Sequence, residues 1–155
     1  MKTSTITIDL AKNVFQFIGF NDQHKTTFNK RINRKQLITL LSQHTPCRIV
    51  MEACYSSHFW GRKGMEFGHT MLLIPAQHVT PFVRGNKNDN NDALAIYEAS
   101  LRPNIKFVPI KTEAQQEILM LHKLRERLMH ARVAATNQLR GLLADFGLIF
   151  PQGED

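Results

Sequence analysis

Two short apolar runs in this chain each end in a carboxylate. Residues 3–9 read TSTITID and residues 48–52 read RIVME, so Asp9 and Glu52 close segments that otherwise have the pattern of β-strands. An acid within an apolar run loses its hydration on burial, so it needs a partner such as a cation or a metal ion. The two runs therefore predict a sheet with acidic side chains at the ends of its strands.

The order of the expected elements indicates the fold class. Three successive strands that read as antiparallel come first, and the later strands are separated by helices, which usually makes them parallel. We therefore expect an α/β fold with a mixed sheet flanked by helices. Strands are predicted at residues 3–9, 13–20, 24–31, 47–51 and 70–74. Helices are predicted from a cap at Asn33 through Leu41, from Ser56 or Ser57 to before Gly68, from Asp89 to about Leu101, and from about Glu113 to Ala144.

Positive charge is concentrated in the first part of the chain. Residues 1–88 carry twelve Lys and Arg against four Asp and Glu, whereas residues 89–155 carry eight against nine. Such localised charge indicates nucleic acid or an anionic membrane surface as a partner, although a solvated basic surface is the simpler alternative. No apolar run approaches the roughly 20 residues that span a bilayer, which argues against a membrane partner.

Cysteine and histidine usage bears on location and on metal binding. Cys47 and Cys54 form no CxxC pair, so we expect free thiols and a cytoplasmic location. The seven His residues show no ligand spacing joined to Cys, which argues against structural zinc.

Two further acids lie at a predicted helix start. Asp89 and Asp92 are three residues apart and share a helix face, so both can point towards the strand ends that carry Asp9 and Glu52. Hard carboxylate oxygens held on different elements suit divalent ions that act on a phosphodiester. Each acid also has a simpler role open to it, as a turn or helix cap or, for Glu52, as a partner of Arg48 or Lys63.

The last expected helix has an apolar seam with the spacing of a coiled coil. Its members are Leu121, Leu124, Leu128, Ala131, Ala135 and Leu142, with Gln138 as a polar interruption. The seam indicates either ordinary packing or a partner helix. The outer cations Lys123, Arg125, Arg127, Arg132 and Arg140 form either a solvated face or a nucleic-acid face.

Three segments together resemble a known family. TIDLAKNVFQF, IVMEACYSSHFW and NKNDNNDALAIYEASLRPNIKFVPIKTEAQQ, followed by an Arg-rich helix, are similar to the N-terminal half of DEDD-type insertion-sequence transposases, the group that includes the Piv site-specific invertases. The resemblance covers nearly the whole chain. One departure is Cys54-Tyr55, which stands where many relatives carry a Thr-Gly pair.

The resemblance implies a ribonuclease H-like fold of the RuvC type. It matches Asp9, Glu52, Asp89 and Asp92 one for one to the four acidic positions, which bind Mg²⁺, or Mn²⁺ in its place, and act in catalysis. Arg84 and Lys87 precede the acid pair and are candidates for phosphate contact, as Arg125 and Arg132 are on the long helix. Residues 1–110 then correspond to a catalytic domain, and residues 111–155 to a long helical segment that begins the linker to a further domain.

The resemblance implies a longer protein, because members of this family are about twice as long as this chain. Their second domain carries a serine proposed as the nucleophile. None of the chain's serines matches it. The family also implies DNA, a structured guide RNA and a multimer formed through the long helix as partners. Two alternatives remain open: a non-catalytic fragment that binds nucleic acid or dimerises, and a stand-alone junction nuclease.

Overall fold

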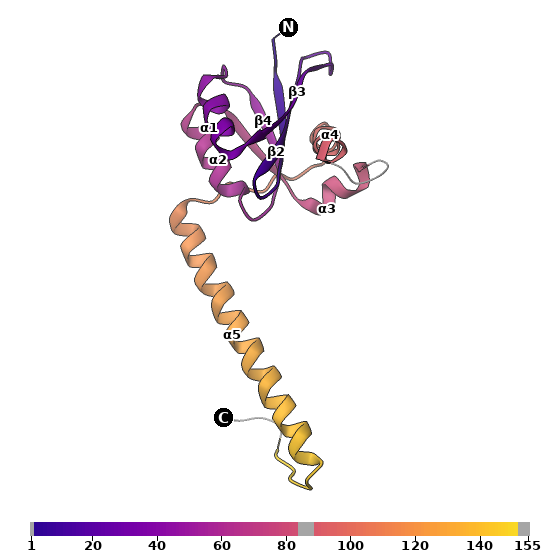
Figure 1. The fold of residues 1–155 in the computed structure, drawn as a ribbon, viewed down its shortest axis with the longest axis vertical. Helices are drawn as coiled ribbons and strands as arrows, with labels where there is room; N and C mark the ends of the chain where they lie inside the picture. The colour runs from indigo at the N-terminus through magenta and orange to yellow at the C-terminus, as the bar shows by residue number, and fades with distance from the viewer. Residues whose placement is uncertain (1, 84–88, 152–155) are drawn as a thin grey trace. The chain divides into compact units, whose positions relative to one another are not determined.

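The chain folds into two compact units, which Figure 1 traces by residue number. The computed structural model describes residues 2–83 and 89–151, and the side chain of Asp89 is not among those it describes. The first unit comprises Met1–Ile110 and the second comprises Lys111–Asp155. The described cysteines Cys47 and Cys54 are both free thiols, as expected.

A five-stranded mixed sheet with the order β3-β2-β1-β4-β5 forms the centre of the first unit. The strands are β1 (Thr5–Leu10), β2 (Val14–Phe20), β3 (Thr26–Asn33), β4 (Arg48–Glu52) and β5 (Thr70–Ile74). The first three are antiparallel neighbours, and β4 and β5 run parallel to β1. This confirms the expected mixed sheet, and its strand order is that of the ribonuclease H-like fold.

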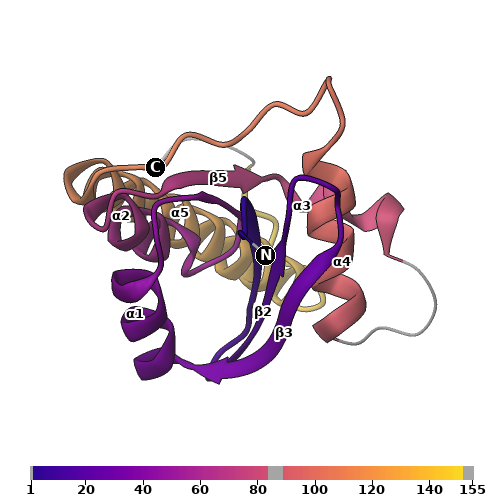
Figure 2. The ribbon, with the colours of Figure 1, turned by 90° about the horizontal axis from the view of Figure 1, so that it is seen from above.

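Two helices cover one face of this sheet, as Figure 2 shows from above. They are α1 (Arg34–Gln43) and α2 (Ser57–Glu66). Helix α1 begins where expected, because Asn33 accepts a hydrogen bond from the Gln36 N–H while the Gln36 side chain accepts one from the Asn33 N–H. Leu37 and Trp60 then pack into a core with the sheet side chains that project towards these two helices. The other large buried side chains of this core are Ile6, Ile8, Phe15, Phe17, Leu41, Ile49, Met51 and Leu73.

The opposite face is covered by α4 (Asp89–Ser100) and by the short α3 (Ala76–Val79) with the 3-10 turn η1 (Thr80–Phe82). Val50 and Ile74 of the sheet pack against Val79 and Ile96 there. The sequence predicted α4 but neither α3 nor η1. These two elements are too short to show a helical period; Pro75 precedes α3, and Pro81 lies within η1.

Helix α4 is fastened to the sheet near its C-terminal end. The Tyr97 ring stacks on Phe20 with centroids 3.6 Å apart, and its hydroxyl shares a 2.8 Å hydrogen bond with Nδ1 of His24. Burial raises the pKa of Tyr97, so the phenol stays protonated in ordinary buffers. Arg48 also donates from Nη2 to the Ser100 carbonyl oxygen at 3.0 Å. These contacts fix the helix across the strands that carry the acids.

The second unit is dominated by one helix, α5 (Glu113–Ala144), which has the bounds that the sequence predicted. A capping box opens it, because Thr112 accepts a hydrogen bond from the Gln115 N–H and the Gln115 side chain accepts one from the Thr112 N–H. Helix α5 buries none of its described residues, and Leu121 and Leu128 are 64% and 70% exposed. Within the described residues, no helix combines the length and the apolar character needed to cross a membrane.

Candidate functional site

The parallel pairing of β1 and β4 brings Asp9 and Glu52 side by side. Ile8 lies opposite Met51 in this pairing, so the next residue of each strand is an acid. Neighbouring strands are about 4.8 Å apart, and side chains at equivalent positions leave the sheet on the same face. The side chains that precede them, Ile8 and Met51, belong to the core under α1 and α2, so the two acids project to the α4 side. The ends of the two strands therefore lie next to each other, as the sequence analysis expected.

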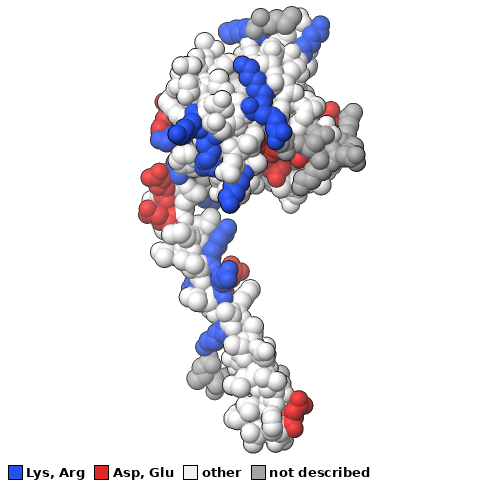
Figure 3. All heavy atoms as spheres, viewed as in Figure 1, with Lys and Arg blue, Asp and Glu red and all other residues white. Residues whose placement is uncertain are grey.

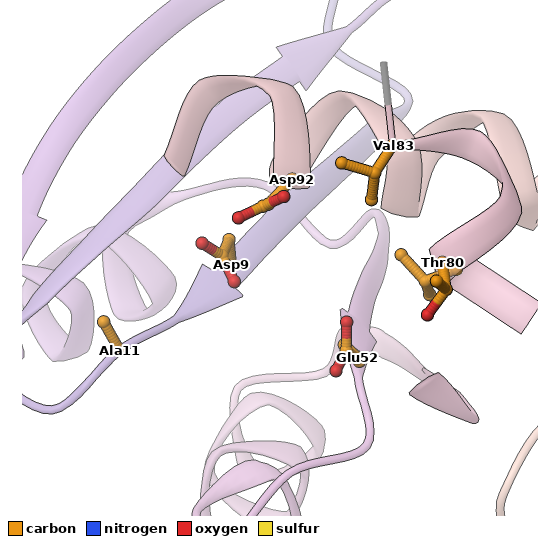
Figure 4. A pocket seen from close by; sticks show the side chains of 7 residues that line it. Asp9, Ala11, Glu52, Thr80, Val83 and Asp92 are labelled. Atoms are coloured by element: carbon orange, nitrogen blue, oxygen red, sulfur yellow. The ribbon is translucent and has the colours of Figure 1, made fainter. Parts of the chain in front are cut away.

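Helix α4 adds a third acid from above the sheet. Asp92, one turn after the start of α4, lines the same pocket as Asp9 and Glu52, and the pocket has a volume of about 490 Å³. Figure 4 shows the Asp92 side chain directed towards Asp9, with Glu52 on the neighbouring strand β4. All three side chains are half-buried. The pocket therefore gathers negative charge from two layers of the fold.

The rest of the pocket wall comes mainly from the segment after β5, for which the sequence predicted no helix or strand. Val79, Thr80 and Val83 line it, and Ala11 lines it beyond the end of β1. Their aliphatic groups line the same space as the carboxylates, and the Thr80 hydroxyl donates to the Ala76 carbonyl oxygen at 3.0 Å. Only a sequence pattern that marks the short turn after Pro75 could have placed Val79, Thr80 and Val83 at the pocket.

The acids are near one another without forming a closed cage. Within residues 2–83 and 90–151, no group of three His, Cys, Asp or Glu side chains is close enough to hold a metal ion as it stands. Asp89 begins α4 one turn before Asp92, and its side chain lies outside the described part of the chain. The described acids thus form an open set of hard oxygen donors along the pocket wall.

A chain of amides ties the first turn of α4 to the sheet. Gln16 lies opposite Asp9 in the β1–β2 pairing, and its Nε2 donates to Oδ1 of Asn29 in β3. Nδ2 of Asn29 in turn donates to Oδ1 of Asn90 at 2.7 Å. Asn90 is the second residue of α4 and lies two residues before Asp92. The amide chain of Gln16, Asn29 and Asn90 therefore links a neighbour of Asp9 with the turn that presents Asp92.

The described structure does not test the cations predicted to contact nucleic acid. Arg84 and Lys87 lie outside the described residues. Arg125 and Arg132 are exposed on α5 in the second unit, where Arg125 borders a shallow hollow of about 340 Å³ with His122 and His130. Their proposed contact with nucleic acid stays a prediction.

Comparison with known proteins identifies relatives over almost the whole chain. A family model described as a transposase, DEDD_Tnp_IS110, matches residues 6–148. A probable family 20 transposase of Pseudomonas aeruginosa is 44% identical over 149 residues, covering 96% of this chain and 44% of that protein. The transposase for insertion sequence element IS1111A of Coxiella burnetii is 41% identical over 146 residues, covering 94% and 40%. The chain thus spans less than half the length of these curated relatives.

A solved structure is also similar in fold. T. thermophilus RuvC in complex with a Holliday junction substrate is 10% identical and has a TM-score of 0.47. The similarity covers 67% of this chain and 98% of that chain.

Proposed function

Since the chain belongs to the DEDD_Tnp_IS110 transposase family, we propose that residues 1–110 are the metal-binding domain of a transposase that cleaves and joins DNA strands. The observation that carries the proposal is the convergence of Asp9, Glu52 and Asp92 in one pocket. Asp89 is proposed as the fourth acid of the site. Residues 111–155 are proposed as the start of a linker to a serine-bearing domain, which the complete reaction requires.

The pocket suits Mg²⁺ better than it suits a softer ion. Its charged groups are carboxylates, which are the hard oxygen donors that Mg²⁺ selects. Magnesium keeps several waters and commonly takes only one or two carboxylates together with substrate phosphates. An open set of acids is therefore compatible with this ion even though the described side chains form no closed cage. Mn²⁺ accepts the same donors and is a suitable replacement.

The proposed chemistry follows from the placement of the acids. Asp9 and Asp92 would hold the ion from the sheet and from α4, and Glu52 would complete the site from the neighbouring strand. A bound ion supplies Lewis-acid stabilisation of the charge that develops on the scissile phosphate. Val79 and Val83 form the less hydrated side of the pocket, where electrostatic interactions are stronger than in bulk water. The protein's part is to position the phosphate and to exclude water.

The partners follow from the family and from the surface of the chain. We propose DNA as the substrate, a structured guide RNA as a second nucleic acid, and a second copy of the chain as the partner of α5. The exposed leucines of α5, among them Leu124 and Leu142 at 50% and 56%, support the last proposal because exposed apolar seams are covered on association. Free thiols at Cys47 and Cys54 support a cytoplasmic location.

Magnesium is expected to stabilise the folded chain. Several carboxylates in one pocket repel one another, and an ion that binds the folded state alone stabilises it by mass action. At about one hundred times its Kd, Mg²⁺ should add about 2.7 kcal/mol and raise the Tm by roughly 5–10 °C. A thermal melt in Mg²⁺ and in EDTA measures the shift, and the Asp92→Asn variant should lose most of it. An unchanged Tm for the wild-type chain would contradict the proposed metal site.

Shortening Asn29 to alanine should weaken metal binding while the chain stays folded. Asn29 is exposed, so the loss of its two neutral hydrogen bonds should lower stability by about 1–2 kcal/mol. Metal affinity should fall about 10-fold or more, because residues that orient ligands matter nearly as much as the ligands. A Mn²⁺ titration followed by electron paramagnetic resonance measures the affinity. Asn104→Ala, at an exposed asparagine after α4, is the control, and equal affinities in both variants would refute the positioning role.

A further inference from the structure

A basic hollow lies between the edge strand β3 and helix α1. Its volume is about 610 Å³, and its cationic and polar lining comes from Lys30, Arg31, Lys35, Gln36 and Thr39. We refer to it as the β3–α1 groove. All five of these residues are exposed, whereas Ile32 between them is buried in the core. The groove is therefore a surface feature built on a rigid strand and a capped helix.

The charge of this region has one sign. Residues 23–51 contain six Lys and Arg and no Asp or Glu. Lys30 and Lys35 thus have no acidic residue among their near sequence neighbours. Figure 3 shows Lys and Arg spread over the visible face of the first unit, where Asp and Glu are fewer. A concave surface lined by one sign of charge concentrates counter-ions of the opposite sign.

Lys30 of the groove and the acids of the pocket project from opposite faces of the sheet. Lys30 lies opposite Phe17 in the β2–β3 pairing, and Phe17 belongs to the core under α1 and α2. Paired residues project on the same face, so Lys30 points to the α1 side. Asp9, Glu52 and Asp92 line the pocket on the α4 side. Lys30 is therefore on the other face of the sheet from the acidic pocket, whereas Arg31, opposite Gln16, projects to the α4 side.

We propose that the β3–α1 groove binds the phosphate backbone of double-stranded DNA outside the acidic pocket. Lys30 and Lys35 contact phosphates, and the outer edge of β3 offers backbone N–H groups that also donate to phosphate oxygens. The groove is lined by no aromatic side chain among the described residues, whereas surfaces for single strands use aromatic rings to stack bases. The contact is thus with a duplex and is independent of base sequence. The choice of DNA depends on the proposed function.

Lysines on an edge strand have another use, since they prevent the strand from pairing with other sheets. That role requires charged side chains, but it does not predict that DNA affinity depends on salt concentration. Phosphate contacts release counter-ions, so each one contributes about 0.9 to the slope of log affinity against log salt concentration. The salt slope consequently separates a DNA contact from protection of the edge.

The test compares two double variants of the chain that lose the same charge. Lys30→Gln with Lys35→Gln alters the groove, and Lys2→Gln with Lys106→Gln alters exposed lysines elsewhere in the first unit. Fluorescence anisotropy measures binding to a duplex DNA of about 20 base pairs over a range of salt concentrations. The groove variant should lose about 2 units of slope and on the order of tenfold in affinity for every duplex sequence, and the control variant should lose much less.

Equal slopes for the two variants, or no binding by the wild-type chain, would overturn the proposal. Tighter binding of the wild type to an RNA hairpin of matched length would overturn the choice of DNA. The Mg²⁺-dependent rise in Tm, measured on the same samples, reports separately on the acidic pocket. If that rise is absent while the slopes differ, the metal site fails and the groove stands.

Discussion

Replacing Asp9 by asparagine is expected to lower divalent-metal affinity by on the order of a hundredfold or more, because the change removes the charge of a proposed ligand that lines the pocket. Asparagine keeps the size and shape of the side chain, so the strand and its packing should persist. Mn²⁺ binding, followed by electron paramagnetic resonance or calorimetry, measures the loss. DNA strand transfer should fall by about a thousandfold wherever the wild-type chain supports it.

The matched control is Glu66→Gln, which also removes one acidic charge. Glu66 is on α2, where it forms an exposed ion pair of 2.8 Å with Lys63 on the far side of the sheet from the pocket. Such surface pairs contribute about 1 kcal/mol or less. Glu66→Gln should therefore leave Mn²⁺ affinity unchanged, and an equal loss in both variants would mean that overall charge, not the site, controls metal binding.

The same pair of proteins distinguishes an enzyme domain from a non-catalytic fragment. Strand transfer by the 155-residue chain above the level of Asp9→Asn would show that the chain is active by itself. Metal binding without strand transfer would show that the acids are in place but that the reaction requires a further domain. Cleavage of four-way junctions in Mg²⁺ would instead favour a stand-alone nuclease.

The adjacency of Asp9 and Glu52 was predictable because it depends on local patterns. Each acid ends a buried strand, and the elements between the two strands place those strands in parallel at the centre of the sheet. The start of α4 was predictable for a similar reason, since Asp and Asn favour first helical turns. Apolar periodicity thus places the acids at the ends of their elements, and the pairing of β1 with β4 brings them to one pocket.

The rest of the pocket depends on contacts between distant segments. Asn29 and Asn90 are 61 residues apart, and their hydrogen bond exists only because the β2–β3 register directs Asn29 towards the start of α4. Val79 and Val83 belong to turns too short for any period to appear. Neither feature follows from a local pattern.

The strand register also adds a proposed contact surface for nucleic acid. Sequence reasoning favoured cations near the acids or on the long helix, such as Lys87 and Arg125. The structure adds Lys30 and Lys35, whose strand and helix meet at a concave surface. In the sequence these lysines do not stand out from the general excess of basic residues. The face from which an edge-strand side chain projects depends on how the strand is paired, and the sequence alone does not show that pairing.

Trp60 is the largest fully buried side chain and anchors α2 to the sheet. Its ring meets Phe15 of β2 edge to face at 5.4 Å, and the Arg34 guanidinium lies 5.3 Å from the ring centre. Replacing Trp60 by alanine would leave a cavity in the core under α1 and α2. We expect a loss of about 3–5 kcal/mol, a large share of the usual stability of a domain, and a fall in Tm of roughly 6–20 °C.

Phenylalanine at position 60 provides a control that isolates the cavity. Trp60 Nε1 is buried without a hydrogen-bond partner among the described residues, so Trp60→Phe removes an unsatisfied donor while it keeps most of the aromatic volume. The loss of stability in Trp60→Phe should be a fraction of that in Trp60→Ala.

Because Trp60 and the acids lie on opposite faces of the sheet, the folded fraction of Trp60→Ala should still bind Mn²⁺. A chemical-denaturation series and a Mn²⁺ titration below the melting range measure the two quantities. Loss of metal affinity in step with loss of stability would show that the two faces of the sheet are not independent.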